Sequence, residues 1–427
     1  MCRLSVHLPM IKWITEQLGT ASYYEYERLP GAGDLHLVDV RELVDGMGND
    51  PRRLRAIIDG TVQQLRSGKR VVICCDQGVS RSNAIALGTL LAVGMDYEQA
   101  LRRVVQDFGN ANISLGVLAD VRELYKSGQR QRTNRSTRIL ITGTTGFIGR
   151  AVLRAMGDEY DFVSLDRSQY DLCRDLLLLD ALVERHGIDT IFHLAHPRLR
   201  STIPAMGESL MMMKTVIELC RVRGLRLVYL SSLVVFGGHV SADSVQAGAT
   251  LRLCPKGVYG ETKCLCEQLI RFGRESSSLD AIVLRPAAVY GPDMERSTIF
   301  AKFFERAVQG RAIRTHQYRN GRPAFDFVFI DDVIDAIRRA LDARPVTPVN
   351  IGTGLMTTTY DLASMIVRIA GSPSMVESVE VHDETSRIVV DAGKAARQLG
   401  WTAKVNLETG LRMVWDSIRQ GHVNLNP

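Results

Sequence analysis

Residues 138–153, RILITGTTGFIGRAVL, decide the fold of most of this chain. An apolar strand pattern is followed directly by Gly143, Gly146 and Gly149, which stand at the start of a helical pattern. Glycines in this spacing allow a tight turn and let a pyrophosphate approach the amino-terminal end of a helix closely. The stretch therefore predicts the first strand, turn and helix of a dinucleotide-binding fold.

The chain beyond this stretch continues the alternation of strands and helices. Helical patterns separate buried strand patterns at 161–166 (DFVSLD), 190–195 (TIFHLA), 225–232 (LRLVYLSS) and 279–286 (LDAIVLRP). Such alternation is typical of a parallel sheet with helices on both faces. We expect a protein of the α/β class, with a Rossmann doubly wound parallel sheet and a smaller C-terminal substrate-binding part.

A basic and polar stretch separates this region from an earlier one. Residues 127–137, SGQRQRTNRST, have no apolar side chain and the composition of a linker. Before it, a small α/β domain is indicated by strand patterns at 34–40 and 70–75 and by helical patterns at 51–68, 81–94, 97–109 and 115–127. We expect a first domain at 1–126, the linker at 127–137 and a second domain at 138–427.

Composition limits the partners and the compartment. The 427 residues are 45% hydrophobic and 23% charged, and their net charge of +6 suits anionic ligands but is too small to indicate nucleic-acid binding. No stretch resembles a membrane span or a signal peptide, and the eight cysteines do not have the spacing of a zinc site or a disulfide framework. We expect a reduced, cytoplasmic protein with no metal, membrane or nucleic-acid partner.

The first domain contains a loop suited to binding a phosphate. Residues 75–82, CDQGVSRS, follow a buried strand and open a helical pattern, so several backbone N–H groups converge there. These donors would lower the pKa of the Cys75 thiol and bind a dianionic phosphate, while Arg81 can hold two phosphate oxygens. Gly78 lets the backbone approach the anion, and Ser82 can donate a hydrogen bond to the sulfur. The layout suits a thiolate nucleophile that forms a phosphocysteine intermediate.

Over about residues 30–126 the chain resembles the dual-specificity branch of the cysteine-dependent phosphatases. The pattern of that family is His-Cys, five residues and Arg-Ser, often with Gly and Ser placed as Gly78 and Ser80 are here. The resemblance implies that Cys75 is the nucleophile and that Arg81 binds the phosphate.

Two features of this domain leave alternatives open. The resemblance implies an aspartate general acid on a loop some residues before the cysteine, and Asp39 is the first choice with Asp45 close behind. Cys74 stands where the family usually has histidine. A domain that binds phosphorylated ligands without hydrolysing them is therefore the alternative to an active phosphatase.

The cofactor contacts of the second domain are predicted from the glycine loop and the strands after it. Asp166 ends the next strand, where it can bind the adenosine ribose hydroxyls and repel a 2′-phosphate, whereas Arg167 could attract one. NAD is therefore expected, and NADP is the less favoured alternative. The full predicted set is Gly143, Thr145, Gly146, Phe147, Ile148, Gly149, Asp166, Arg167, Asp171, Leu172, Leu194, Ala195 and Lys263.

Three features carry the chemistry of the second domain. Ser231 and Ser232 end a strand pattern, and Tyr259 and Lys263 are four positions apart, which places phenol and ammonium on one face of a helix. The cation would lower the phenol pKa, so that Tyr259 can exchange a proton with a substrate alcohol or carbonyl while a serine hydroxyl holds the same oxygen. His193 and His196, near the cofactor strands, are expected to pack in the fold instead of serving as ligands.

Across essentially all of 137–420 the chain resembles the extended short-chain dehydrogenase/reductase family. The matching segments are HLA at 193–195, RPAAVYGP at 285–292, FVFIDDV at 327–333, NIGTG at 350–354 and LGW at 399–401. The resemblance implies Ser232, Tyr259 and Lys263 as the catalytic set, NAD as the cofactor and a nucleotide-linked sugar as the common type of substrate.

Departures from the family narrow the reaction and the substrate. Dehydratases of the family have an Asp-Glu pair after the serine, and its epimerising reductases have cysteine there, whereas this chain has Leu233 and Val234. An epimerase or a simple dehydrogenase remains. Many members bind the diphosphate with an arginine where this chain has Phe325, and the nearest arginine is Arg322. A sugar phosphate or nucleotide is therefore an alternative to a nucleotide sugar.

The sequence as a whole predicts a bifunctional enzyme. Its second domain would act as an NAD-dependent epimerase or dehydrogenase on a phosphorylated sugar, nucleotide or nucleotide sugar, and its first would remove a phosphate. The alternative is a sugar-nucleotide epimerase with an inactive, regulatory phospho-ligand-binding domain. A homodimer is a possible assembly.

Overall fold

The computed structural model describes residues 11–105, 113–125, 137–165, 167–168, 170–239, 245–248, 251–343 and 348–421. The chain divides into two compact units. The first contains residues 1–135 and 174–185, and the second contains residues 136–173 and 186–427. The sequence prediction places all of 138–427 in the second domain. It does not include the assignment of residues 174–185 to the first unit.

A buried ion pair accounts for this grouping. Asp180 lies on helix α7 (Leu176–His186), and its Oδ2 is 2.8 Å from Nη1 of Arg122 on helix α5 (Leu115–Glu123). The two side chains are only 2% and 8% exposed. A buried charge that loses its partner is strongly destabilising, so this pair holds Asp180 in the first unit.

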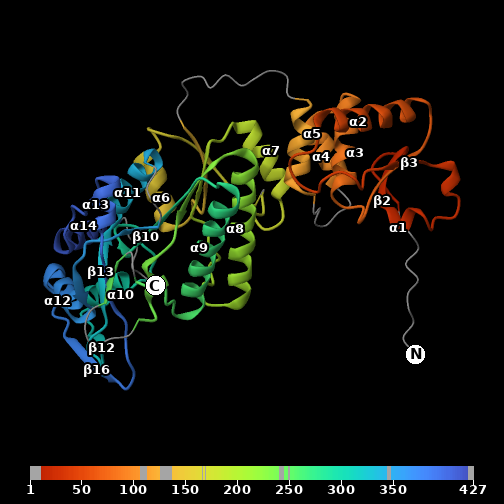
Figure 1. Ribbon diagram of the computed structural model, residues 1–427. Helices are drawn as coiled ribbons and strands as arrows, with labels where there is room; N and C mark the ends of the chain where they lie inside the picture. Colours follow the sequence, from red (N-terminus) through yellow and green to blue (C-terminus); the bar gives the residue numbers. More distant parts are fainter. Residues whose placement is uncertain are drawn as a thin grey trace, which may run out of the picture. The chain divides into compact units, whose positions relative to one another are not determined.

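The first unit is built on a four-stranded sheet in the order β1–β2–β4–β3. Strands β2 and β3 are parallel to β4, and β1 is antiparallel to β2. The strands are β1 (Lys12–Trp13), β2 (Leu18–Ser22), β3 (His36–Asp39) and β4 (Val71–Cys75). The other elements are α1 (Tyr23–Tyr26), a 3₁₀ turn η1 (Ala32–Asp34), α2 (Pro51–Arg66), α3 (Arg81–Ala92), α4 (Tyr97–Val105) and α5, and Figure 1 shows the helices.

Most of these elements match the sequence prediction. The strands expected at 34–40 and 70–75 are β3 and β4, and the four expected helices are α2 to α5. The sequence predicts that α4 extends to 109, but residues 106–112 lie outside the described residues. Strand β2 is missing from the prediction although all five of its residues are buried. Its sequence, LGTAS, has few of the β-branched and aromatic residues that indicate a strand.

The second unit confirms the predicted Rossmann-like α/β fold. Its main sheet has six parallel strands in the order β14–β10–β8–β7–β5–β6. Figure 1 shows helices α8 and α9 on one face of this sheet and α6 and α11 on the other. The strands are β5 (Arg138–Thr142), β6 (Asp161–Ser164), β7 (Thr190–His193), β8 (Arg226–Leu230), β10 (Ala281–Pro286) and β14 (Val349–Ile351). The helices are α6 (Phe147–Met156), α8 (Ile203–Arg223), α9 (Gly257–Ser277) and α11 (Ile330–Asp342).

The strand order reverses beside β5. From β5 the chain moves outward to β6 and then returns to β7 on the other side of β5. Where the loops after two neighbouring strands run in opposite directions, a crevice forms between them at the carboxyl edge of the sheet. Ligands of open α/β folds bind in this crevice. Both the glycine loop after β5 and the loop after β7 therefore lie at this crevice.

A smaller part of the second unit is built from segments that lie before, between and after the last two main strands, β10 and β14. Its strand β13 pairs with β11, β15 and β17, β17 also pairs with β9, and β12 pairs with β16. The elements are a 3₁₀ turn η2 (Leu233–Phe236), β9 (Val245–Ala247), β11 (Ala288–Tyr290), α10 (Ile299–Val308), β12 (Ile313–Tyr318), β13 (Ala324–Phe329), β15 (Met356–Thr358), α12 (Thr359–Ala370), β16 (Val376–Val381), β17 (Arg387–Val390), α13 (Gly393–Leu399) and α14 (Leu407–Arg419). None of the helices in the described ranges is long and apolar enough to cross a membrane.

Gly78 provides a test of how the first unit is packed. Its φ is +69°, and an added Cβ would lie 2.4 Å from both the carbonyl carbon of Ala21 and the nitrogen of Ser22. Gly68 has a φ of +83° but nothing within 4 Å of such a Cβ. We expect Gly68→Ala to cost about 1–2 kcal/mol from the left-handed backbone alone. Gly78→Ala should cost about 2–5 kcal/mol because the neighbouring strand must also move.

Hydrogen exchange of the β4 amides would measure how much each of the two substitutions lowers the free energy needed to open the sheet. Equal losses in Gly68→Ala and Gly78→Ala would contradict the close approach of Gly78 to β2.

Candidate active sites

Cys75 lies at the end of β4, under the loop that leads into α3. Its sulfur accepts a hydrogen bond from the backbone nitrogen of Gly78 at 3.2 Å and is 3.4 Å from the Ser82 hydroxyl. Burial raises the pKa of the Cys75 thiol, but the Ser82 hydroxyl and the backbone N–H groups of Ser82, Val79 and Gly78 outweigh burial and leave that pKa lowered. Hydrogen bonds to the charged form thus favour a thiolate at this position.

The neighbouring Cys74 has the opposite environment. Burial, together with the proximity of Cys75 and Asp39, raises the pKa of the Cys74 thiol to about 12. The residue that replaces the expected histidine is therefore an inert thiol of the core, and the two adjacent cysteines are chemically distinct.

Arg81 is held at the mouth of the same loop. Its Nη1 donates to the carbonyl oxygens of Arg41 at 2.6 Å and Leu43 at 3.2 Å, and its Nη2 forms an ion pair with Asp76. The Nε of Arg81 is buried and has no hydrogen-bond partner among the described residues. Both Nη atoms of Arg81 are thus already bonded to other groups of the protein, and Nε is the N–H of this side chain without a partner among the described residues.

The two predicted general acids have different partners. Arg41 forms an ion pair with Asp39, with Nη2 2.7 Å from Oδ2, and its hydrogen bonds hold the pKa of the Asp39 carboxyl below its ordinary value. A carboxyl with a lowered pKa is a poor proton donor near neutral pH. Asp45 instead accepts a hydrogen bond from Ser80 in the phosphate loop. Asp45 is thus the candidate that is linked to the phosphate loop, and the choice between the two acids stays a prediction.

In the second unit, the three glycines after β5 have two separate functions. A Cβ on Gly143 would lie 2.8 Å from the backbone nitrogen of Ala195, and one on Gly149 would lie 2.4 Å from the carbonyl oxygen of Gly143. These two glycines let the chain pack on itself. A Cβ on Gly146, the N-cap of α6, would meet only the Gly143 oxygen, at 3.3 Å, among the described residues. Gly146 therefore leaves the helix terminus accessible to a pyrophosphate, which fits NAD.

The loop after β7 is fastened to the end of β5. The hydroxyl oxygen of Thr142 accepts hydrogen bonds from the backbone nitrogens of Leu194 and Ala195, both at 3.1 Å. It also shares a hydrogen bond of 3.0 Å with Nδ1 of His193. Burial lowers the pKa of His193 to about 3, so its ring is neutral and packs as expected. Leu194 and Ala195 are thereby held beside Gly143.

The residues predicted near the adenosine are only partly described. Asp166 lies outside the described residues. Nη2 of Arg167 is 2.6 Å from Oε1 of Glu208, so the charge that could attract a 2′-phosphate is already paired. Asp171 accepts a hydrogen bond from the backbone of Cys173 at 2.8 Å, and Leu172 is buried.

Tyr259 and Lys263 lie on α9, and Ser232 follows β8 at the carboxyl edge of the main sheet. Lys263 is 5% exposed, and its Nζ donates to the carbonyl oxygen of Leu230 at 2.8 Å and lies 5.8 Å from the centre of the Tyr259 ring. Ser232 caps η2 and accepts a hydrogen bond from Val234 at 3.3 Å. The hydrogen bond from Lys263 to Leu230 thus brings α9 to the end of β8, at the carboxyl edge of the main sheet.

A buried network separates the roles of the two adjacent serines. Ser231 donates to Glu267, which also forms a bidentate ion pair with Arg285 on β10. All three residues are less than 9% exposed. Ser231 is therefore engaged in the fold, and Ser232 is the serine that remains for chemistry. The sequence analysis missed Glu267, although it follows Lys263 at the same four-residue spacing that links Tyr259 to Lys263.

His196 contacts Tyr259, the predicted catalytic tyrosine. The sequence did not predict this contact. The centres of the His196 and Tyr259 rings are 5.1 Å apart, with the rings edge to face at 70°. Nδ1 of His196 is 2.9 Å from the carbonyl oxygen of Pro197, and Nε2 is buried. Neither residue type nor spacing indicates this contact, because the two residues lie on different elements far apart in the chain.

Comparison with known proteins identifies the second unit. Residues 139–352 match the NAD dependent epimerase/dehydratase family. The chain belongs to this family. A UDP-glucose 4-epimerase of Mycolicibacterium smegmatis is 28% identical over 314 residues, which cover 64% of this chain and 96% of that epimerase.

Solved structures of the family have the same fold. The crystal structure of a UDP-glucose 4-epimerase of Thermotoga maritima with UDP-glucose is similar at a TM-score of 0.59 and 26% identity, over 67% of this chain and 100% of that one. A UDP-glucose 4-epimerase of Thermus thermophilus in complex with NAD is similar at a TM-score of 0.57 and 22% identity, over 66% of this chain and 99% of that one. The cofactor of this epimerase/dehydratase family member is NAD.

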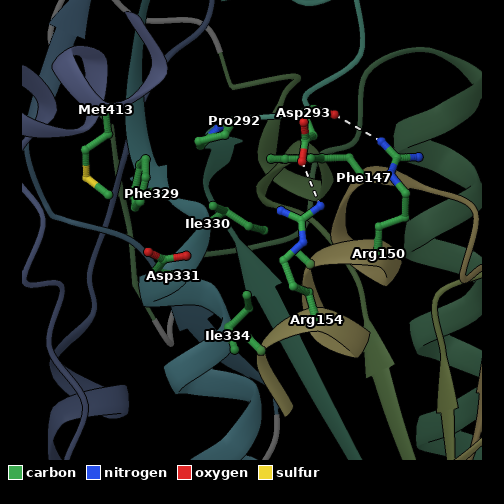
Figure 2. A pocket seen from close by; sticks show the side chains of 12 residues that line it. Phe147, Arg150, Arg154, Pro292, Asp293, Phe329, Ile330, Asp331, Ile334 and Met413 are labelled. Carbon is green, nitrogen blue, oxygen red and sulfur yellow. Dashed lines mark hydrogen bonds and ion pairs between the residues drawn. The ribbon is translucent and has the colours of Figure 1, made fainter. Parts of the chain in front are cut away.

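Two arginines of α6 contact the turn after β11, and one of them, Arg150, also contacts the glycine loop at 143–146, here called the NAD loop. Arg150 donates through Nη1 to the carbonyl oxygen of Thr145 in the glycine loop and through Nη2 to that of Asp293 at 3.0 Å. Arg154 forms an ion pair of 2.8 Å with the Asp293 carboxylate. Figure 2 shows both arginines directed toward Asp293, whose φ of +63° is unusual for a residue other than glycine. Arg150 thus joins the NAD loop to the turn after β11.

Arg150, Arg154 and Asp293, which form this brace, line a pocket that is separate from the predicted catalytic residues. Apolar side chains line much of this pocket, and Ser232, Tyr259 and Lys263 are not among its lining residues (Figure 2). Among the described residues no group of three or more His, Cys, Asp or Glu side chains is arranged to hold a metal ion.

Removing the brace should weaken NAD binding. We expect Arg150→Ala to raise the Kd for NAD about fivefold, which corresponds to about 1 kcal/mol for one lost hydrogen bond to the loop. Isothermal titration calorimetry would measure the change. Arg338→Ala is the matched control, because Arg338 pairs with Glu159 at 2.8 Å just after α6 but does not contact the loop. An equal rise in Kd in both variants would contradict a specific brace.

Proposed function

We propose that the chain is an NAD-dependent epimerase that acts on a nucleotide-linked sugar, with Ser232, Tyr259 and Lys263 as its catalytic set. The observation that supports this most is the position of Tyr259 and buried Lys263 on α9, where Lys263 donates to Leu230, two residues before Ser232, at the end of β8. Its relatives named UDP-glucose 4-epimerase support the substrate class.

In the proposed reaction each residue of the set moves or holds a proton. Tyr259 takes the proton of the substrate hydroxyl as the carbon is oxidised and returns it when the carbonyl is reduced. The Lys263 ammonium stabilises the phenolate form of Tyr259, and the Ser232 hydroxyl donates a hydrogen bond to the reacting oxygen. When bound, NAD would supply the hydride chemistry of both steps, and the net result would be inversion of the carbon.

The residues after Ser232 favour epimerisation over loss of water. Leu233 and Val234 in η2 have no group that could act as acid or base. The buried carboxylate of Glu267, nearby on α9, is already paired with Arg285 and hydrogen-bonded to Ser231. An elimination step would need a free acid and a free base. We therefore propose that the product retains every oxygen of the substrate.

The diphosphate of the substrate would be bound differently from the family pattern. Phe325 on β13, where many members have arginine, is 39% exposed. The guanidinium of Arg322 lies 3.9 Å above the Tyr360 ring. Turnover of a panel containing UDP-sugars, sugar monophosphates and nucleotides would identify the substrate class.

Association into a homodimer remains a prediction.

Replacing the tyrosine tests the proposed reaction. We expect Tyr259→Phe to lower kcat about 10²–10⁴-fold, because the variant loses the proton donor and acceptor of the transition state. The Kd for NAD should change little. The wild-type protein should accumulate no net NADH with its sugar substrate, and deuterium at the oxidised carbon should be retained in the product by mass spectrometry. Stoichiometric NADH would instead indicate a dehydrogenase, and loss of water from the substrate would refute the argument from Leu233 and Val234.

A second function is supported by the first unit. We propose that Cys75 and Arg81 form a site for a phosphate monoester and that Cys75 attacks its phosphorus, with Asp45 as the proton donor to the leaving group. The contrast between the lowered pKa of Cys75 and the pKa of about 12 for Cys74 supports this proposal, because only a thiolate is an effective nucleophile. A domain that binds a phosphorylated ligand without hydrolysis is the alternative.

Two measurements on Cys75 test the second function. Iodoacetamide should alkylate Cys75 at a pH well below the ordinary cysteine pKa of about 8.5, because its lowered pKa keeps the thiolate populated there, whereas Cys74 should stay unreactive. Cys75→Ser should abolish phosphate release from an aryl phosphate and leave NAD binding unchanged. Cys74→Ser is the matched control and should retain release.

The outcomes separate the alternatives. Release that persists in Cys75→Ser would exclude the phosphatase assignment. Protection of Cys75 from alkylation by inorganic phosphate, without any turnover, would identify a binding domain.

A further inference from the structure

His196 has an unusual combination of neighbours for a packing residue. Its ring is edge-on to Tyr259, with the ring centres 5.1 Å apart, and it stands in the loop that Thr142 fastens beside the NAD loop. Backbone contacts of the preceding residues thus hold it at the carboxyl edge of the sheet. Its orientation therefore matters for whatever binds at Tyr259.

The contact with Pro197 fixes the tautomer of His196. The carbonyl oxygen of Pro197 can only accept a hydrogen bond, so Nδ1, 2.9 Å away, carries the proton. Burial, with the cations Lys263 and Arg200 nearby, lowers the pKa of His196 to about 4, so the ring is neutral over the physiological range. Nε2 of His196 is therefore a hydrogen-bond acceptor with a free lone pair.

That acceptor is buried and has no partner among the described residues. A buried polar atom without a hydrogen bond costs stability, and one that persists in a fold calls for an explanation. His193, three residues earlier in the same strand and loop, shows the usual solution, because its ring shares a hydrogen bond with Thr142. His196 differs from it in leaving Nε2 unpaired next to Tyr259.

We propose that His196 is a ligand-contacting residue, whose Nε2 accepts a hydrogen bond from an O–H or N–H donor of a molecule bound against Tyr259. The donor is neutral, because an anion would be repelled by the lone pair, and a bound cation would be disfavoured beside Lys263 and Arg200. Two molecules could supply it: the carboxamide of NAD or a hydroxyl of the sugar. The inference rests on the proposed site at Tyr259.

The main test replaces the acceptor while preserving the ring. His196→Phe keeps an aromatic edge against Tyr259 but has no lone pair. We expect the ligand-free variant to unfold at the same or a higher temperature than the wild type, because an unpaired buried acceptor is gone. We expect its affinity for the ligand that supplies the donor to fall about 2–12-fold, as for one neutral hydrogen bond. Thermal unfolding and calorimetric titration measure both effects without activity.

Three variants complete the design. His196→Gln retains a neutral acceptor and should recover part of the affinity. His196→Leu also lacks the acceptor and replaces His196→Phe if that variant does not fold. His193→Phe is the matched control, and it should lower the unfolding temperature of the ligand-free protein because it removes a hydrogen bond that is already made.

Titrations with NAD alone and with UDP-glucose in the presence of NAD distinguish the two sources of the donor. Weaker binding of NAD itself assigns the carboxamide, and weaker binding of the sugar nucleotide alone assigns a sugar hydroxyl. Unchanged affinities in His196→Phe, or a parallel loss of ligand-free stability and affinity, would overturn the proposal. If the wild type binds NAD but not UDP-glucose, the proposed substrate class fails, and the NAD titration still decides the role of His196.

Discussion

The hydroxyl of Thr142 is the group on which the arrangement of the loops in the second unit depends. At the end of β5 it accepts hydrogen bonds from the backbone nitrogens of Leu194 and Ala195, and so joins the two loops that leave the sheet at its reversal of strand order. Gly143 makes the contact possible, because any side chain there would collide with Ala195. This junction sets the distance between the NAD loop and the loop that places His196 against Tyr259.

The other side of the site is fixed by charge. Glu267 and Arg285 form a buried ion pair that also binds Ser231, and this network connects α9 to the ends of β8 and β10. Buried charges are tolerated only when paired and hydrogen-bonded, so the network allows little change in the position of α9. Because Tyr259 and Lys263 lie on the same helix, the network also determines where the phenol and the ammonium are held.

The first unit shows how the same residue type can have opposite chemistry at adjacent positions. Cys74 and Cys75 are both buried at the end of β4, yet the pKa of one thiol is raised and that of the other is lowered. Side chains of a strand alternate between its two faces. Cys74 faces the core, whereas Cys75 faces the loop whose backbone N–H groups stabilise a thiolate. The single residue of offset between the two cysteines is therefore enough to separate a core residue from a candidate nucleophile.

The sequence by itself determined the features that depend on neighbouring residues. The glycine spacing at 143–149, the strand and helix patterns and the four-residue spacing of Tyr259 and Lys263 are local, and they predicted the strand β5, the helix α6 and the placement of Tyr259 and Lys263 on one helix. Only the tertiary structure showed that the segment Leu18–Ser22 is a buried strand, β2. Only the tertiary structure decided the contacts between distant segments, which are the pairing of Arg122 with Asp180, the hydrogen bond from Arg150 to Asp293 and the contact of His196 with Tyr259. Periodicity and turn chemistry report which way a chain folds locally. They carry no information on which of many buried or charged side chains will meet, because that depends on how the packed elements bring distant residues together.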